Sequence, residues 1–266
     1  MHPKRLASMT VAVATVLLST PAAAQTLHVN PRWKECSFQI DPSLTQAAWH
    51  QFTREAGLAI YFRSLSDARP LAKGKFEVSA LQWRTNIDDS KPAWNDTFVH
   101  PDSTHWLTEG SGLAIPGIAV RAGVDGKTDV SAYVTKNPGA NYGFYGGAVQ
   151  HSIVGDAAAK WNASARASYI RMYGPEDMDF SVYGADFVAS RALRLSPWAT
   201  LSPYAGVSGY LARGHEKTPV VSLANENVFG ARASVGAELR LFKARLAAEY
   251  NAARVGGVSL RIGFGA

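Results

Sequence analysis

The chain has 266 residues and a formal net charge of +6, with 27 lysines and arginines against 21 aspartates and glutamates. Hydrophobic residues make up 47% of the chain, yet no run of about 20 apolar residues occurs, which excludes a helical membrane protein. The single cysteine, Cys36, excludes an internal disulfide.

The N-terminus has the three parts of a secretory signal peptide. Lys4 and Arg5 supply the positive charge, residues 9–20 form a short and mostly apolar stretch, and residues 22–24 are alanines typical of a cleavage site. The apolar stretch is too short to span a bilayer as a helix. We therefore expect residues 1–24 to be a signal peptide. Export, and the lack of a basic run in the remaining chain, argue against nucleic acid as a partner.

Residues 25–73 are predicted to contain one short helix and to form a periplasmic or plug segment. Asp41 followed by Pro42 is typical of a helix start, because aspartate caps free N–H groups and proline fits the first turn. Apolar spacing predicts a helix over residues 41–56, closed by Gly57. The residues that share its apolar face are Leu44, Ala48 and Phe52. Residues 58–65 fit a further strand, an approach segment or part of a plug.

From residue 74 onward, apolar and polar residues alternate with a period of two, which is typical of β-strands. In residues 229–241, seven apolar residues share one face, and the other face carries three charges and no bulky apolar residue. The predicted strands are about 10 to 14 residues long, which favours membrane-spanning strands over the shorter strands of a soluble β-sandwich. Ten are expected, with eight or twelve as alternatives: 74–85, 112–124, 127–136, 142–154, 159–172, 178–193, 198–212, 226–241, 244–254 and 256–264.

The connections between these strands alternate between short and long. Short turns are predicted at residues 125–126, 155–156, 196–197 and 242–243, and long polar loops at 86–111 and 213–225. This pattern predicts short turns on the periplasmic side and long loops on the outside. The tryptophans of the loop at 86–111 are expected to pack on the rim of the barrel.

The last ten residues alternate strictly, with Ser259 and Arg261 on the face opposite Val258 and three further apolar residues. An exported chain with such a terminal strand resembles a bacterial outer-membrane β-barrel. The resemblance implies an all-β, antiparallel up-and-down transmembrane barrel over residues 74–266, in the outer membrane of a Gram-negative cell. It also implies outer-membrane lipids and the barrel-insertion machinery as partners. The candidate insertion signal is formed by Leu260, Ile262 and Phe264.

The polar faces of the predicted strands carry five acids and six arginines that we expect to line the lumen. They are Glu77, Arg121, Asp129, Arg166, Asp186, Arg232, Glu238, Arg240, Arg245, Glu249 and Arg261. Unpaired charges in a narrow interior are costly, so ion pairs are expected, among them a direct contact between Glu249 and Arg261 across the last two strands. A ten-stranded barrel lies near the size that side chains can fill.

Two functions stay open: a barrel of the transport or pore class that passes a small solute, and a structural or surface-interaction barrel with a closed, ion-paired lumen. An enzyme is not expected, because the acids and histidines near residues 86–111 all lie in one loop. His151 and Ser152 are strand neighbours that point to opposite faces. His100, Asp102 and His105 match no standard metal spacing, so no metal or cofactor is expected.

Overall fold

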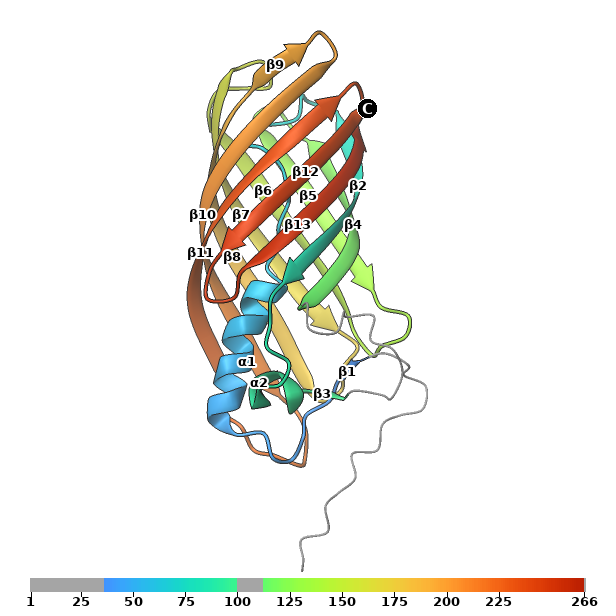
Figure 1. Cartoon of the computed structure of the whole chain (residues 1–266), viewed down its shortest axis with the longest axis vertical. Coiled ribbons are helices and arrows are strands. Elements are labelled where there is room, and N and C mark those ends of the chain that lie inside the picture. The colour runs from blue at the N-terminus through green and yellow to red at the C-terminus, as the bar shows by residue number, and fades with distance from the viewer. Residues whose placement is uncertain (1–35, 100–111, 266) are drawn as a thin grey trace, which may run out of the picture.

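The computed structural model describes residues 36–99 and 112–265, and the expected signal peptide lies outside them. Its dominant feature is a closed antiparallel barrel of ten long strands (Figure 1). The strands are β2 (Phe76–Thr85), β4 (Leu113–Gly123), β5 (Thr128–Lys136), β6 (Gly143–Val154), β7 (Trp161–Tyr173), β8 (Met178–Arg191), β10 (Ala199–Glu216), β11 (Glu226–Leu241), β12 (Ala244–Ala252) and β13 (Gly257–Gly265). The predicted fold class is therefore confirmed.

Each strand pairs with its neighbour in the chain, and the pairing of β13 with β2 closes the cylinder. A short strand, β9 (Leu193–Ser196), pairs with the first residues of β10. Figure 1 places β9, the start of β2 and the C-terminal strand end at one end of the barrel, and we refer to it as the turn end. The opposite end carries the connections predicted to be long, and we refer to it as the loop end.

The two faces of the sheet differ in the manner that alternation predicts. Val235 on β11 points outward and is 58% exposed, whereas Arg232 and Glu238 on the same strand point inward and are buried. Aromatic side chains ring the outer surface near both ends, with Trp161, Trp198 and Phe242 toward the turn end and Tyr145, Tyr169, Tyr183 and Phe229 toward the loop end. Such an apolar band between two aromatic girdles is the surface of a barrel that spans a bilayer.

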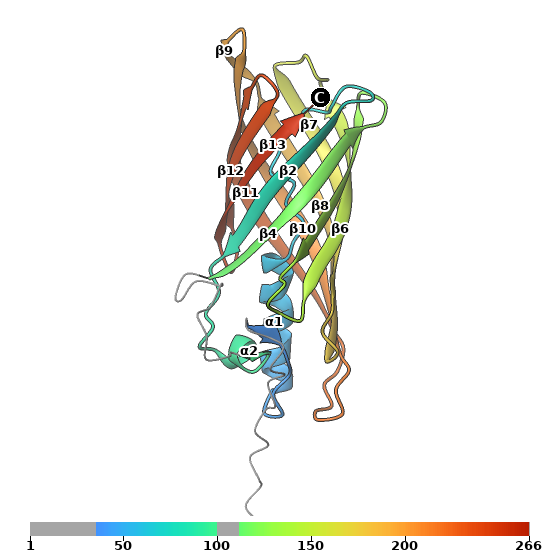
Figure 2. The same cartoon turned by 90° about the vertical axis from the view of Figure 1, so that its right-hand side faces the viewer.

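The N-terminal residues lie inside this barrel rather than beside it. Helix α1 (Gln46–Ala59) packs against the inner face of β10 and β11 at the loop end, where the Tyr210 hydroxyl donates to the Arg54 carbonyl at 3.1 Å. The chain then runs through the lumen toward the turn end, where β2 begins (Figures 1 and 2). No helix in the part of the chain that the structure describes is long and apolar enough to cross a bilayer.

Two small elements complete the loop end. β1 (Ser37–Phe38) pairs with β3 (Phe98–Val99), and α2 (Pro92–Asn95) precedes β3. This pairing ties the N-terminal segment to the first connection of the barrel, although the two are separated by about sixty positions in the chain. The rest of that connection, residues 100–111, lies outside the described residues.

Helix α1 begins and ends later than predicted. The Asp41 carboxylate accepts from the Ser43 N–H at 2.8 Å and forms a turn, and the helix is instead capped by Thr45, whose hydroxyl accepts from the Ala48 N–H at 3.2 Å. Gly57 does not end the helix. A Cβ there would lie 2.6 Å from the Ala212 Cβ, so this glycine allows α1 to approach β10 closely.

The assignment of the outer face can be tested by placing arginine at two positions, one in the apolar band and one in an exposed loop. Val235→Arg places a charge in the apolar band and is expected to lower the free energy of unfolding by about 2–4 kcal/mol. The matched control is Val220→Arg in the exposed loop between β10 and β11, where the change should stay below about 1 kcal/mol. Urea unfolding in phosphatidylcholine vesicles measures both values, and equal losses would contradict the assigned face.

Candidate functional site: the charged lumen and its N-terminal segment

All eleven residues predicted to line the lumen point into the barrel. Nine of them are buried, and the side chains of Arg240 and Arg245 keep only 19% and 16% of their surface exposed. Alternation places them there, because every second residue of a strand faces the interior. The structure thus brings together charges from strands that are distant in the sequence. Their role as a pore lining stays a prediction.

Glu238 on β11 is the centre of the network toward the turn end. Its carboxylate accepts from Arg240 at 2.5 Å and from Arg261 at 2.7 Å, and Arg245 lies 3.7 Å away. Glu77 on β2 contacts two of the same arginines, with Arg245 at 3.3 Å and Arg261 in hydrogen-bond contact. Four strands are therefore linked through one set of charge-assisted hydrogen bonds, which are stronger than neutral ones.

The network continues into the N-terminal segment. One oxygen of Asp67 accepts from Arg240 at 2.8 Å, and the other accepts from Arg69 at 2.8 Å. Arg69 also donates to the Ser202 hydroxyl on β10 at 2.6 Å. Asp67 is fully buried, so the segment supplies a carboxylate that the barrel wall itself does not provide at this position.

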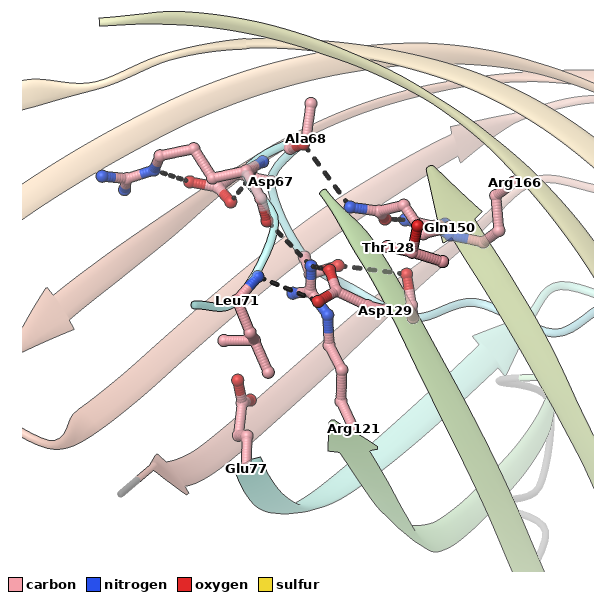
Figure 3. A network of polar contacts seen from close by, with 12 residues as sticks. Asp67, Ala68, Leu71, Glu77, Arg121, Thr128, Asp129, Gln150 and Arg166 are labelled. Carbon is pink, nitrogen blue, oxygen red and sulfur yellow. Dashed lines mark hydrogen bonds and ion pairs between the residues drawn. The ribbon is translucent and has the colours of Figure 1, made fainter. Parts of the chain in front are cut away.

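The opposite wall holds the backbone of the same segment (Figure 3). Arg121 on β4 donates to the Arg69 carbonyl at 2.8 Å and to the Asp129 carboxylate at 2.5 Å. Asp129 in turn accepts from the Leu71 N–H at 2.9 Å, and Gln150 on β6 lies 3.4 Å from the Ala68 carbonyl. Residues 67–71 are therefore bound from both sides of the barrel, and Arg121, Asp129 and Arg240 are the predicted lumen residues among their partners.

A second cluster surrounds Arg232. Its guanidinium lies 3.8 Å from Asp186 and 3.5 Å from Glu249, and it stacks over the Tyr61 ring at 4.5 Å. Arg166 completes the group, with Asp186 at 4.0 Å. Tyr61 belongs to the N-terminal segment, so this cluster too is formed jointly by the wall and the segment.

The predicted direct contact between Glu249 and Arg261 is wrong. On β12 and β13, Glu249 lies opposite Ser259, and Arg261 lies opposite Ala247. The strands are shifted by two residues from the expected register, because the turn is centred on Arg254 rather than on Val255. A shift of two keeps every side chain on its face, so both residues remain in the lumen with other partners.

The loop end of the lumen is filled by apolar side chains instead. Trp49 and Phe52 of α1 stack at 5.4 Å, and Phe52 meets Trp94 of α2 at 5.1 Å. The Trp94 indole donates to Glu55 at 2.7 Å. The expectation that the tryptophans of the first loop pack on the rim is therefore wrong for Trp94, which is buried because α1 provides an apolar surface inside the barrel. Trp106 lies outside the described residues.

Three charged residues of this site are absent from the predicted lumen set: Arg63, Asp67 and Arg69. They lie within residues 25–73, for which a plug was one predicted alternative, but no alternation of apolar and polar residues assigned their side chains to an inner face. Arg63 is fully enclosed and donates to the Leu58 carbonyl at 2.6 Å and the Thr85 hydroxyl at 3.0 Å. One signal was available, because six predicted lumen arginines against five acids imply a further carboxylate from elsewhere.

The contacts of this site are ion pairs and charge-assisted hydrogen bonds. His151 is exposed on the outer face and Ser152 is buried on the inner face, as their adjacent positions predict. Within residues 36–99 and 112–265, no group of three or more metal-binding side chains is brought together. His100, Asp102 and His105 lie outside these ranges. That the chain is not an enzyme stays a prediction.

Comparison with known proteins gives structural likeness without close relatives. No protein-family model matches the sequence, and no curated protein matches it. Ail, the attachment invasion locus protein of Yersinia pestis, shares 12% identity over 73% of this chain and 99% of its own, with a TM-score of 0.31. An outer membrane channel from Pseudomonas putida F1 shares 14% identity over 76% of this chain and 98% of its own, with a TM-score of 0.41. LpxR from Salmonella typhimurium shares 10% identity over 71% of this chain and 99% of its own, with a TM-score of 0.35.

These likenesses are too distant to assign a function, and the classification follows from the barrel itself. Ten antiparallel strands close into a cylinder with an apolar outer face, two aromatic girdles and a charged interior. This protein is a small, ten-stranded antiparallel β-barrel with the outer surface of a barrel that crosses a membrane.

The contribution of Asp67 to the site can be measured directly. Asp67→Asn removes the carboxylate that pairs with buried Arg69 and one of the two that pair with Arg240, and it is expected to destabilise the barrel by about 3–5 kcal/mol. Asp88→Asn is the control, because the Asp88–Lys91 pair is half exposed and is worth at most about 1 kcal/mol. Urea unfolding of both proteins in the same detergent gives the comparison. A loss for Asp67→Asn as small as that of the control would mean that the segment is not held by its charge.

Proposed function

We propose that this protein is a closed outer-membrane barrel that works at its loop end rather than as an open pore. The observation that carries the proposal is the N-terminal segment, which occupies the lumen from α1 to Leu71. Tyr61, Phe62, Leu65, Asp67 and Ala68 each keep at most 2% of their surface exposed. A lumen in which both the wall and the segment are this deeply buried leaves no continuous aqueous path.

The arrangement also supports a direction for the chain. The barrel starts at the turn end with β2, but residues 36–59 lie at the loop end. Short turns are typical of the periplasmic side of such barrels, so the loop end is expected to face outward. The N-terminal segment would then be displayed at the cell surface together with the first loop, to which β1 and β3 join it.

Transport remains the second candidate, favoured by one observation. Without the N-terminal segment, the wall of the lumen holds six arginines against five acids. The excess of arginine favours an anionic solute if the segment withdraws, because rings of basic side chains select anions. The two functions therefore differ in whether residues 60–71 ever leave the lumen.

Conductance in planar bilayers separates the two functions. The full chain should give no steady channels, and channels should appear when residues 25–71 are deleted. Because that deletion removes charges that the wall needs, a cross-linked variant is also required. We place a disulfide between Ala68→Cys and Ser190→Cys in a Cys36→Ser background, since the Ala68 N–H donates to the Ser190 hydroxyl at 3.1 Å.

The oxidised cross-linked protein should be silent even under voltages that open the full chain, and reduction should restore the behaviour of the full chain. Steady conductance of the oxidised protein would show that the lumen is open around the segment and would contradict the closed barrel.

Labelling of intact cells tests the direction of the N-terminal segment. Single cysteines replace Ser43, Glu216 or Asp156 in the Cys36→Ser background and are treated with a membrane-impermeant maleimide. Ser43 is exposed beside α1 at the loop end, Glu216 ends β10 at the same end, and Asp156 lies in a turn at the other. We expect Ser43 and Glu216 to react and Asp156 to stay protected. Reaction at Glu216 without reaction at Ser43 would contradict threading of the segment through the barrel.

A further inference from the structure

Arginine side chains form a row on the outer surface of the barrel, just beyond the loop-end aromatic girdle. The register places Tyr169 opposite Tyr183, and one step further toward the loop end it places Arg171 opposite Ser181. On the next strand, Arg213 lies opposite the same Ser181. Two arginines from β7 and β10 therefore flank a serine on β8, on the face that carries the apolar band.

A hollow of about 390 Å³ lies between these side chains. It exists because Ser181 is much smaller than the arginines on either side of it. Tyr169 and Tyr183 border the hollow toward the membrane, while Asp179 and His215 border it toward the loop end. The hollow is thus apolar on the membrane side and charged on the other.

Two arginines, Arg171 and Arg213, and two acids, Asp179 and Glu226, line the hollow. Asp179 is shared by Arg171 and Lys217, each at 3.4 Å. Glu226 contacts His50 of α1 at 2.7 Å. Arg213 donates to the Asn227 side chain at 3.0 Å, and no carboxylate among the described residues lies within ion-pair distance of it. Among the described residues, Arg213 therefore enters no ion pair, and Arg171 shares its carboxylate with Lys217. These groups lie on the exposed side of the strands, so solvent and membrane can reach them.

The level of the hollow relative to the membrane indicates which ligand it binds. Tyrosines of an aromatic girdle lie at the level of lipid headgroups, and the arginines follow them by one residue pair. Guanidinium groups bind phosphate oxygens with two parallel hydrogen bonds. We propose that Arg171 and Arg213 bind the phosphate of an anionic lipid headgroup, with the adjoining acyl chain against Tyr169 and Tyr183. The proposal depends on the barrel crossing the membrane at this girdle, and it is independent of whether the lumen is closed.

Native mass spectrometry of the full chain, released from dodecyl maltoside micelles, tests the proposal. The probes are bis-phosphorylated lipid A, phosphatidylcholine and inorganic phosphate. The test variant is Arg171→Ala combined with Arg213→Ala. Its control is Arg191→Ala, which removes an exposed arginine from the outer face of β8 near the turn end, where Arg191 stacks on Trp161 at 5.1 Å. Heat-modifiable migration on gels verifies that each variant is folded.

We expect lipid A to be retained more tightly than phosphatidylcholine, and inorganic phosphate to show no retention, because the acyl chain is part of the contact. Loss of each arginine should weaken lipid A binding roughly fivefold, so the double variant should lose more than tenfold. Asp179→Asn should strengthen binding, since it removes the competing carboxylate. Equal loss in the Arg191→Ala control, no loss in the double variant, or binding of inorganic phosphate as tight as that of lipid A would each overturn the proposal.

Discussion

The ion pairs between lumen arginines and buried carboxylates are the constraint on which the rest of this structure depends. An arginine enclosed in a barrel is costly unless an acid lies beside it, and six arginines point inward from the wall alone. Asp67 provides one of the required acids from outside the wall, through Arg240 and Arg69. The barrel and its N-terminal segment are therefore interdependent, because Asp67 of the segment pairs directly with Arg240 of the wall. This explains why residues 67–71 are bound by both side-chain and backbone contacts from opposite walls.

The interior is divided into two parts that hold the segment by different forces. Toward the turn end the contacts are directional and charged, and they define the position of Asp67 and Arg69. Toward the loop end the contacts are apolar, and α1 with α2 fills the wider opening with aromatic side chains such as Phe52 and Trp94. Apolar burial supplies most of the free energy of such packing, whereas the charged contacts determine register. A segment anchored by both is suited to close the barrel permanently and to present its first residues at the loop end.

The outer surface meets a different requirement, because its side chains must match the layers of a membrane. The apolar band meets acyl chains, the aromatic girdles meet the headgroup level, and the arginines beyond the tyrosines meet phosphates. Val235, Tyr183 and Arg213 represent these three layers on neighbouring strands. Because residues alternate along each strand, one face of the strand contacts the lipid bilayer and the other packs against the protein-filled interior.

The sequence by itself determined the strands, their faces and the closed barrel, because a period of two is a local property that each segment carries independently of its neighbours. It also placed the eleven lumen charges on the inner face. It did not determine which charge meets which. Glu249 pairs with Arg232 rather than Arg261, because the register depends on where the turn is centred, and a shift of two residues leaves the alternation unchanged. It left open whether residues 25–73 form a plug or a periplasmic segment. Asp67 and Arg69 have no periodic signal, and their position is decided only when the closed wall brings Arg240 and Ser202 within their reach.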